Sequence, residues 1–235
     1  ERQFAQLLDQ IADYPMDRFP VQQLALDDAD AGFTFEASKQ NNPHEDWAAT
    51  AHARSGVNCS GCHQVKVDDD SDELRWVEKP TQDVCSSCHS VEIARFKQGK
   101  HGMKLAAGLE PLKVSEARQP MRAEAAHESL TCNSCHVAHS YDVKFAAAEA
   151  CMNCHDDGHT REYAGSPHHQ LWQKELAGDL PQGAGVSCAT CHMPRIEFDV
   201  DEWSTRVMVD HNQNANLSPN SKMIRSSCMS CHGLE

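Results

Sequence analysis

The stretch Cys132-Asn133-Ser134-Cys135-His136 is one of six copies of Cys-x-x-Cys-His in this chain of 235 residues. The other copies begin at Cys59, Cys85, Cys151, Cys188 and Cys228. Together the copies use all 12 cysteines. The motif is the attachment signature of c-type haem: both thiols add to the porphyrin, and the adjacent imidazole becomes the proximal iron ligand. The pattern therefore predicts six covalently bound c-type haems.

Each motif supplies two predicted attachment residues and one predicted iron ligand. The attachment residues are Cys59, Cys62, Cys85, Cys88, Cys132, Cys135, Cys151, Cys154, Cys188, Cys191, Cys228 and Cys231. The proximal ligands are His63, His89, His136, His155, His192 and His232. Zinc knuckles and a disulfide framework also explain paired cysteines. Neither requires a histidine after the second cysteine in all six copies, so haem is the favoured interpretation.

Nine further histidines exceed the six that the irons need as second axial ligands. Seven of them lie shortly before, shortly after or between motifs, where a distal ligand is expected: His52, His101, His127, His139, His159, His168 and His211. His44 and His169 are weaker candidates, and the surplus of histidine favours packing roles for the methionines, Met193 included. Two strong axial ligands saturate the iron and favour electron transfer, whereas an open sixth position permits substrate chemistry.

The composition predicts a thin protein core. Apolar residues make up 40% of the chain, and six haems leave about 39 residues for each one. The porphyrins are therefore expected to contact one another and to supply much of the buried apolar surface. We predict a mainly α fold with much irregular loop and little or no sheet, as a single multihaem cytochrome c domain around six stacked haems.

The domain is predicted to span residues 43–235, with residues 1–42 as an N-terminal segment that packs on it. Helical spacing of Phe4, Leu7, Leu8 and Ile11 supports this packing. Asn42-Pro43 resembles a helix start, and the helix is expected to reach about Ala53. Further short helices are predicted at 123–129, 143–150 and 169–177, and 202–210 is expected to be extended.

The formal net charge of −14 favours basic redox partners and disfavours nucleic acid. No stretch approaches the roughly 20 apolar residues of a membrane span. Because c-type haem is attached outside the cytoplasm, we expect an exported protein, periplasmic or extracellular, from which a signal peptide has been removed.

From about Cys85 onward, several motifs carry a family resemblance. They are Gly99-Lys100-His101-Gly102, Cys132–His139, Cys151–His159, Ser166-Pro167-His168, Gly185–Met193, Val209-Asp210-His211 and Cys228–Gly233. In these the chain resembles the multihaem superfamily of hydroxylamine oxidoreductase, octahaem tetrathionate reductase and pentahaem nitrite reductase. The resemblance implies a mainly helical fold around haems stacked in alternating parallel and perpendicular pairs. It also supports the distal ligands named above.

The chain departs from that superfamily at the catalytic haem. All six motifs end in histidine, where the nitrite reductases have a lysine at one haem, and Tyr14, Tyr141 and Tyr163 do not match the context of the cross-linked tyrosine of hydroxylamine oxidoreductase. The chain therefore resembles the electron-conducting part of such an enzyme without its catalytic centre.

Three functions follow as hypotheses. The favoured one is electron transfer between redox partners by a six-haem cytochrome, with no catalytic residue. The second is an oxidoreductase that acts on small nitrogen or sulfur compounds at one haem with an open distal site. The third, compatible with the first, is a subunit of an extracellular conductive filament, formed by self-association.

Overall fold

The computed structural model describes residues 43–68, 72–199, 202–214 and 221–233. The predicted N-terminal segment 1–42, with its expected helix near Phe4–Ile11, lies outside the described residues. The described chain divides into two compact units. Unit 1 is Glu1–Cys85 with Ala138–Tyr141, and unit 2 is Ser86–Val137 with Asp142–Glu235.

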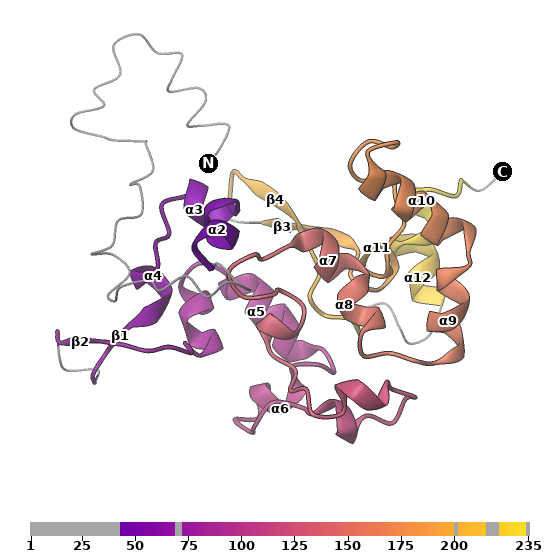
Figure 1. Ribbon diagram of the computed structural model, residues 1–235. Coiled ribbons are helices and arrows are strands. Elements are labelled where there is room, and N and C mark those ends of the chain that lie inside the picture. The colour runs from indigo at the N-terminus through magenta and orange to yellow at the C-terminus, as the bar shows by residue number, and fades with distance from the viewer. Residues whose placement is uncertain (1–42, 69–71, 200–201, 215–220, 234–235) are drawn as a thin grey trace, which may run out of the picture. The chain divides into compact units, whose positions relative to one another are not determined.

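Unit 1 contains short helices and one small hairpin (Figure 1). Helices α2 and α3 are followed by α4, and the antiparallel strands β1 and β2 pair with Val65 opposite Arg75. Their bounds are α2 Pro43–Ala48, α3 Ala51–Arg54, α4 Ser60–His63, β1 Gln64–Lys66 and β2 Leu74–Trp76. The 3₁₀ helix η1, Gln82–Ser87, crosses into unit 2. The single helix expected from Pro43 to Ala53 is two helices, because the Thr50 hydroxyl accepts the Ala53 N–H and caps a new start.

Unit 2 contains the remaining helices and a second hairpin, β3–β4, in which Ile196 pairs with Met208. The α-helices are α5 Ser90–Gln98, α6 Met103–Ala106, α7 Val143–Ala147, α8 Glu149–Met152, α9 Gly158–Ala164, α10 Pro167–Ala177, α11 Cys188–His192 and α12 Ser221–Ser226. The 3₁₀ helices are η2 Val114–Glu116, η3 Ala123–Ala125, η4 Cys132–Ser134 and η5 Cys228–Ser230. The strands are β3 Arg195–Asp199 and β4 Thr205–Val209.

The predicted fold class is confirmed: the described chain is mainly helix and loop, with two small sheets. The extended segment expected at 202–210 is β4, and the helix expected at 169–177 is the C-terminal part of α10. The prediction for 123–129 is wrong in length, since only the 3₁₀ turn η3 forms there. The helix expected at 143–150 is interrupted at Ala148, between α7 and α8.

Both ends of helix α10 are specified by its own sequence. The Ser166 hydroxyl accepts the His169 N–H, Pro167 starts the helix, and Gly178 ends it in the left-handed conformation with φ 84°. Most other helices have fewer than eight residues. Isolated helices of that length are marginal in water, so their stability must come from what packs against them.

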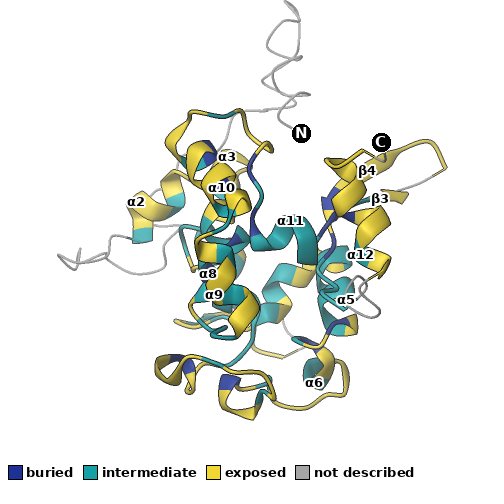
Figure 2. Cartoon of the chain, turned by 90° about the vertical axis from the view of Figure 1, so that its right-hand side faces the viewer, coloured by how far each residue is buried: buried dark blue, intermediate teal, exposed yellow. Residues whose placement is uncertain are grey.

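The described chain has little apolar protein core of its own. Its buried apolar residues are Ala53, Val114, Ala125, Ala148, Ala150, Trp172 and Met208, of which four are alanine. Figure 2 shows helices that are mostly intermediate or exposed, with only scattered buried positions. Large apolar side chains such as Leu74 and Ile224 are more than half exposed. The polypeptide alone therefore buries too little apolar surface to explain the compactness of its two units.

Candidate haem-binding sites

The Cys-x-x-Cys-His motifs form single helical turns. In four of them the N–H of the histidine donates to the carbonyl of the first cysteine, at 2.8 Å in the motifs of His63, His155 and His232 and at 2.9 Å in that of His136. Residues three and four apart lie on the same face of a helix. Each such turn therefore presents two sulfur atoms and one imidazole on one side, as attachment to a single porphyrin requires.

Five of the six predicted proximal histidines lie beside a predicted distal histidine. The ring centroids are 5.9 Å apart for His63 and His139, 6.2 Å for His155 and His101, 6.3 Å for His136 and His211, 5.9 Å for His192 and His159, and 6.1 Å for His232 and His168. Each pair lies within one unit, the first in unit 1 and the other four in unit 2. The two members of each pair are at least 33 residues apart in the sequence.

This spacing fits one metal ion between two imidazoles. A metal–imidazole bond is about 2 Å long, so two nitrogens on opposite sides of one ion are about 4 Å apart and the ring centroids roughly 6 Å apart. Rings in direct contact would stack more closely. In each of the five pairs, the residues present therefore fit an iron of haem with two axial imidazoles.

Backbone carbonyls orient two of the paired rings. His63 Nδ1 lies 2.7 Å from the Val77 carbonyl oxygen, and His211 Nδ1 lies 3.0 Å from that of Val209. When Nδ1 carries the proton and donates it to the carbonyl, Nε2 keeps its lone pair for a metal. The Trp76 ring stacks on His63 with centroids 5.0 Å apart and an interplanar angle of 11°.

Burial favours the neutral form of three paired histidines, because it lowers the pKa of each. It lowers the pKa of His101 to about 4, and the nearby His155 contributes to the same shift. Burial also lowers the pKa of His139 and of His192, with smaller contributions from His63 and His159 respectively. Since only the neutral imidazole binds a metal, these environments favour the ligating form.

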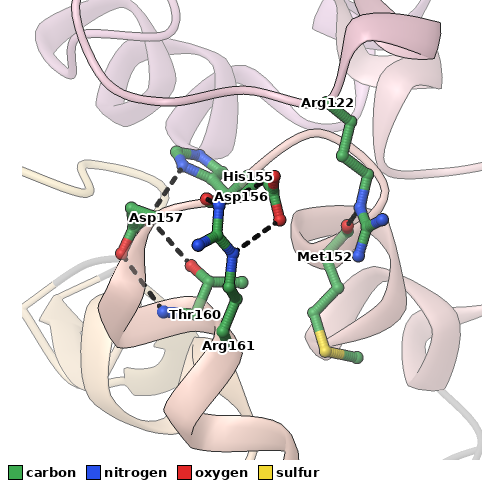
Figure 3. A network of polar contacts seen from close by, with 7 residues as sticks. All are labelled: Arg122, Met152, His155, Asp156, Asp157, Thr160 and Arg161. Atoms are coloured by element: carbon green, nitrogen blue, oxygen red, sulfur yellow. Dashed lines mark hydrogen bonds and ion pairs between the residues drawn. The ribbon is translucent and has the colours of Figure 1, made fainter.

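Asp157 lies between the motif of His155 and the start of α9, and Figure 3 shows its contacts with His155 and Thr160. One of its carboxylate oxygens lies 3.9 Å from His155 Nδ1, and its two oxygens accept the Thr160 N–H and hydroxyl at 3.1 and 2.9 Å. Asp157 thereby caps α9, the helix that carries His159. The neighbouring Asp156 binds the Arg161 guanidinium, with contacts of 3.0 and 3.1 Å. Helix α9 is thus fixed at the motif of His155.

The thiols of successive motifs in unit 2 are close neighbours. Cys151 and Cys188 share a hydrogen bond, which with burial raises the pKa of the Cys151 thiol. Burial raises the pKa of Cys135, and proximity to Cys154 adds to it. Burial also raises the pKa of Cys191, which lies near Cys228 and Cys231. The four C-terminal motifs, from Cys132 onward, therefore form a series in which each attachment site adjoins the next.

The other predicted distal ligands have different surroundings. His52 meets the ring of Tyr141 edge-on, with centroids 4.7 Å apart. The side chain of His127 is 79% exposed, and its Nε2 lies 3.1 Å from Glu128 Oε1. The proximal candidate His89 has a carboxylate oxygen of Glu92 3.9 Å from Nδ1. The ligand roles of His52, His127 and His89 stay predictions, as do those of the paired histidines.

The weaker candidates are also engaged elsewhere. His169 uses both ring nitrogens: Nδ1 lies 2.7 Å from the Ala164 carbonyl oxygen, and Nε2 lies 3.1 Å from Gln173 Nε2. The His44 ring lies 6.1 Å from that of Trp47. For Met193 the structure gives a contact of 4.0 Å between its sulfur and Gln213 Nε2.

Sequence reasoning missed the groups that orient these rings. The carbonyls of Val77 and Val209, the carboxylate of Asp157 and the ring of Trp76 all act from outside the motifs. A signal was present only for Asp157, whose position before Gly158-His159-Thr160 is typical of a helix N-cap. Backbone carbonyls carry no such signal, because any residue type supplies one.

The cysteines form no disulfide in the structure, and all 12 of them lie in the described part of the chain. Within the described residues, no group of three or more His, Cys, Asp and Glu side chains could hold a metal ion. The described helices also include none that is long and apolar enough to cross a membrane.

The motif turns and histidine pairs define a class, the multihaem cytochromes c, and comparison with known proteins agrees with it. A family model described as cytochrome c3 matches residues 51–156, just under half of the chain. The matched segment contains the first four motifs. It supports a multihaem cytochrome c with covalently bound c-type haem. No curated protein and no solved structure matches the chain.

Proposed function

We propose that this chain is a six-haem electron-transfer cytochrome that relays electrons between redox partners outside the cytoplasm. The observation that carries the proposal is the set of five histidine pairs with ring centroids 5.9–6.3 Å apart. When bound, the haem irons supply one-electron chemistry by alternating between the ferric and ferrous states. With an imidazole on each side, such an iron has no position for a substrate.

The residues of the chain have three roles in this proposal. The cysteine pairs hold each porphyrin by two thioether bonds, and the histidines at the ends of the motifs bind the irons from one side. The second ligands are His139 for the His63 site, His101 for the His155 site and His211 for the His136 site, with His159 and His168 serving the remaining two pairs. Carbonyls such as Val77 hold the rings in the orientation that directs Nε2 to the metal.

The scarce protein core supports the haem number. Within the described residues, seven apolar residues are buried and four of them are alanine, so most of the apolar interior must be supplied by something else. Porphyrin rings between the helices would cover side chains such as Leu74, Val143 and Ile224, which are 52–66% exposed. In this view the haem-binding free energy is also folding free energy, as it is in small metal-dependent domains.

The relation to the hydroxylamine oxidoreductase superfamily is part of the proposal. Its support comes from the motifs beyond residue 156, where the cytochrome c3 model ends. Three of them, Ser166-Pro167-His168, Cys188–His192 and Val209-Asp210-His211, supply members of the histidine pairs of unit 2. The proposed partners are redox proteins with basic docking surfaces, because the formal charge of this chain is −14.

The test is a count of covalent haem and of axial ligands on the holoprotein. Intact-mass spectrometry after denaturation should give six haem increments on one polypeptide. Electron paramagnetic resonance of the ferric protein should show low-spin irons, with at least five of the bis-imidazole type. A polypeptide without covalent haem would contradict the proposal, and so would a majority of high-spin irons.

A further inference from the structure

The buried carboxylate of Asp210 is a charged group that ligand binding itself does not require. Its side chain is only 3% exposed, and it immediately precedes His211, the proposed second ligand at the His136 site. A carboxylate removed from water costs free energy unless it is paired and hydrogen-bonded. Its partners should therefore show what the charge does.

Arg95 neutralises this carboxylate with two parallel hydrogen bonds. Arg95 Nε donates to Oδ1 at 2.9 Å and Nη2 donates to Oδ2 at 2.6 Å. This is the bidentate fork that gives Arg–carboxylate pairs their defined geometry. Arg95 lies on α5, the helix that begins directly after His89, so the ion pair joins the helix of one motif to the ligand loop of another.

The same carboxylate closes the loop around His211. Asp210 Oδ1 also accepts the Asn212 N–H at 2.9 Å, which closes a side-chain turn with His211 as its middle residue. The Asp210 N–H donates to the Pro194 carbonyl at 2.9 Å. The backbone is therefore fixed on both sides of His211, and the Val209 carbonyl fixes its imidazole.

A second ion pair supports the same contact between α5 and β4. Arg206 Nη2 lies 3.5 Å from Glu92 Oε1, one turn before Arg95 on α5. The signs of the two pairs are opposite: α5 supplies the acid in one and the base in the other. A shift of α5 by one turn would bring Glu92 to Asp210, and like charges would oppose it. The charges thus favour a single register.

We infer that Arg95 and Asp210 are positioning residues, which hold His211 against the iron of the His136 site and so keep that site closed to external ligands. This inference rests on the proposed function, because it takes His211 as an axial ligand. Neither residue touches the metal; Arg95 acts through Asp210, and Asp210 acts through the backbone of His211.

The experiment measures carbon monoxide binding to the reduced holoprotein, since carbon monoxide enters only where the distal imidazole leaves the iron. In Arg95→Gln and Asp210→Ala, we expect one haem in six to bind carbon monoxide at least tenfold faster than in the wild type. A tenfold change in rate corresponds to about 1.4 kcal/mol in the activation free energy of binding. Asp210→Asn should be intermediate, because its amide oxygen still accepts the Asn212 N–H but lacks the charge for Arg95. Arg95→Lys keeps the positive charge but cannot form the bidentate fork, so it should keep only part of the protection.

The matched control is Lys104→Gln, which removes another ion pair of unit 2, that between Lys104 and Glu116 at 3.0 Å. It should bind carbon monoxide as the wild type does. Haem content, measured as the pyridine haemochrome, establishes that each variant is fully assembled. If Arg95→Gln and Asp210→Ala lose haem, the test is the rate of carbon monoxide binding in Asp210→Asn compared with that in Lys104→Gln.

A further variant, His211→Ala, tests the ligand assignment separately from the positioning role of Arg95 and Asp210. It should open one haem in six to carbon monoxide; if it opens none, the ligand assignment in the proposed function is wrong. If His211→Ala opens one haem while Arg95→Gln, Asp210→Ala and Asp210→Asn all behave as Lys104→Gln does, the positioning role is overturned and the proposed function stands.

Discussion

The two units hold their histidine pairs in different ways. In unit 1 the pair of His63 and His139 is nearly parallel, with an interplanar angle of 12°, and its second member comes from Ala138–Tyr141, far along the chain. In unit 2 four pairs follow one another, with interplanar angles of 34–80°, and thiols of successive motifs adjoin. Unit 1 is thus built on one pair, and unit 2 on a connected series.

The two units also differ in formal charge. In residues 1–85, which with the uncharged segment 138–141 make up unit 1, 17 acidic residues outnumber 7 basic ones, whereas the rest of the chain has 18 and 14. Most of the formal charge of −14 therefore belongs to unit 1. The comparison teaches that folding of the series and docking of a basic partner need not depend on the same part of the chain.

The largest expected effect is that of removing a haem from each unit. Replacing Cys151 and Cys154 by alanine removes an attachment site inside the series, so more than one haem should be lost. Replacing Cys59 and Cys62 by alanine should leave five haems bound, because unit 1 has a single pair. Intact-mass spectrometry counts the haems. Equal losses in the two variants would contradict the distinction between a series and a single pair.

The next effect concerns His139, the proposed second ligand of unit 1, which comes from far along the chain. His139→Ala should convert one low-spin iron in six to high-spin in the ferric protein, because the His63 site loses its second imidazole. Electron paramagnetic resonance measures this conversion.

His127→Ala is the control for that experiment, since the His127 side chain is 79% exposed and lies beside Glu128. It should leave the spectrum unchanged. A high-spin iron in His127→Ala, with none in His139→Ala, would reverse the assignment of these two histidines.

A smaller effect is expected from removing one helix cap in each unit. Thr50→Ala in unit 1 and Ser166→Ala in unit 2 each remove a hydroxyl that accepts a backbone N–H, and each should lower the free energy of unfolding by about 1 kcal/mol. Thermal unfolding of the holoprotein measures both. Ser166→Ala should also speed carbon monoxide binding at one haem, because α10 carries His168, the proposed second ligand at the His232 site; an unchanged rate in Ser166→Ala would contradict this.

The smallest expected effect is that of salt on electron transfer to a basic partner. Raising ionic strength from 0.01 to 0.15 M shortens the Debye length from about 30 to about 8 Å, so the bimolecular rate should fall severalfold. Stopped-flow mixing with a small basic cytochrome measures it. Neutralising Glu45 and Asp46 of unit 1 as Gln and Asn should reduce the salt dependence more than neutralising Glu124 and Glu128 of unit 2. The reverse order would assign docking to unit 2.

Much of this arrangement could be predicted from the sequence, because its chemistry is local. A motif of five residues contains both thiols and the proximal imidazole, and one helical turn brings them together. Cap residues such as Ser166 and turn residues such as Gly178 likewise specify their own elements. The predominance of short helices and loops followed from the small apolar content per motif.

The pairing of histidines could not be predicted, because it is long-range. His159 lies four residues after His155, yet its partner is His192, and His139 lies three residues after His136, yet its partner is His63. Local order therefore suggests the wrong partners. The turn at His139 also depends on tertiary structure, since its φ of 69° is unusual for any residue other than glycine.

One structural requirement is visible in the sequence only in retrospect. A Cβ atom at Gly102 would collide with the Phe96 carbonyl oxygen, so this glycine allows the close turn that brings His101 back after α5. In the motif Gly99-Lys100-His101-Gly102, the histidine is the residue that the sequence marks as a candidate ligand. Its second glycine, Gly102, is required because the backbone passes too close to the Phe96 carbonyl for a Cβ atom, and only the structure shows this.

The central claim is that paired imidazoles hold at least five irons, and near-infrared magnetic circular dichroism of the ferric holoprotein tests it most directly. The charge-transfer band reports the axial ligands of each low-spin iron, and its intensity per haem gives their number. We predict bis-imidazole signals from at least five irons in six. An intensity that corresponds to three or fewer, with the balance high-spin or bound to methionine, would contradict the account.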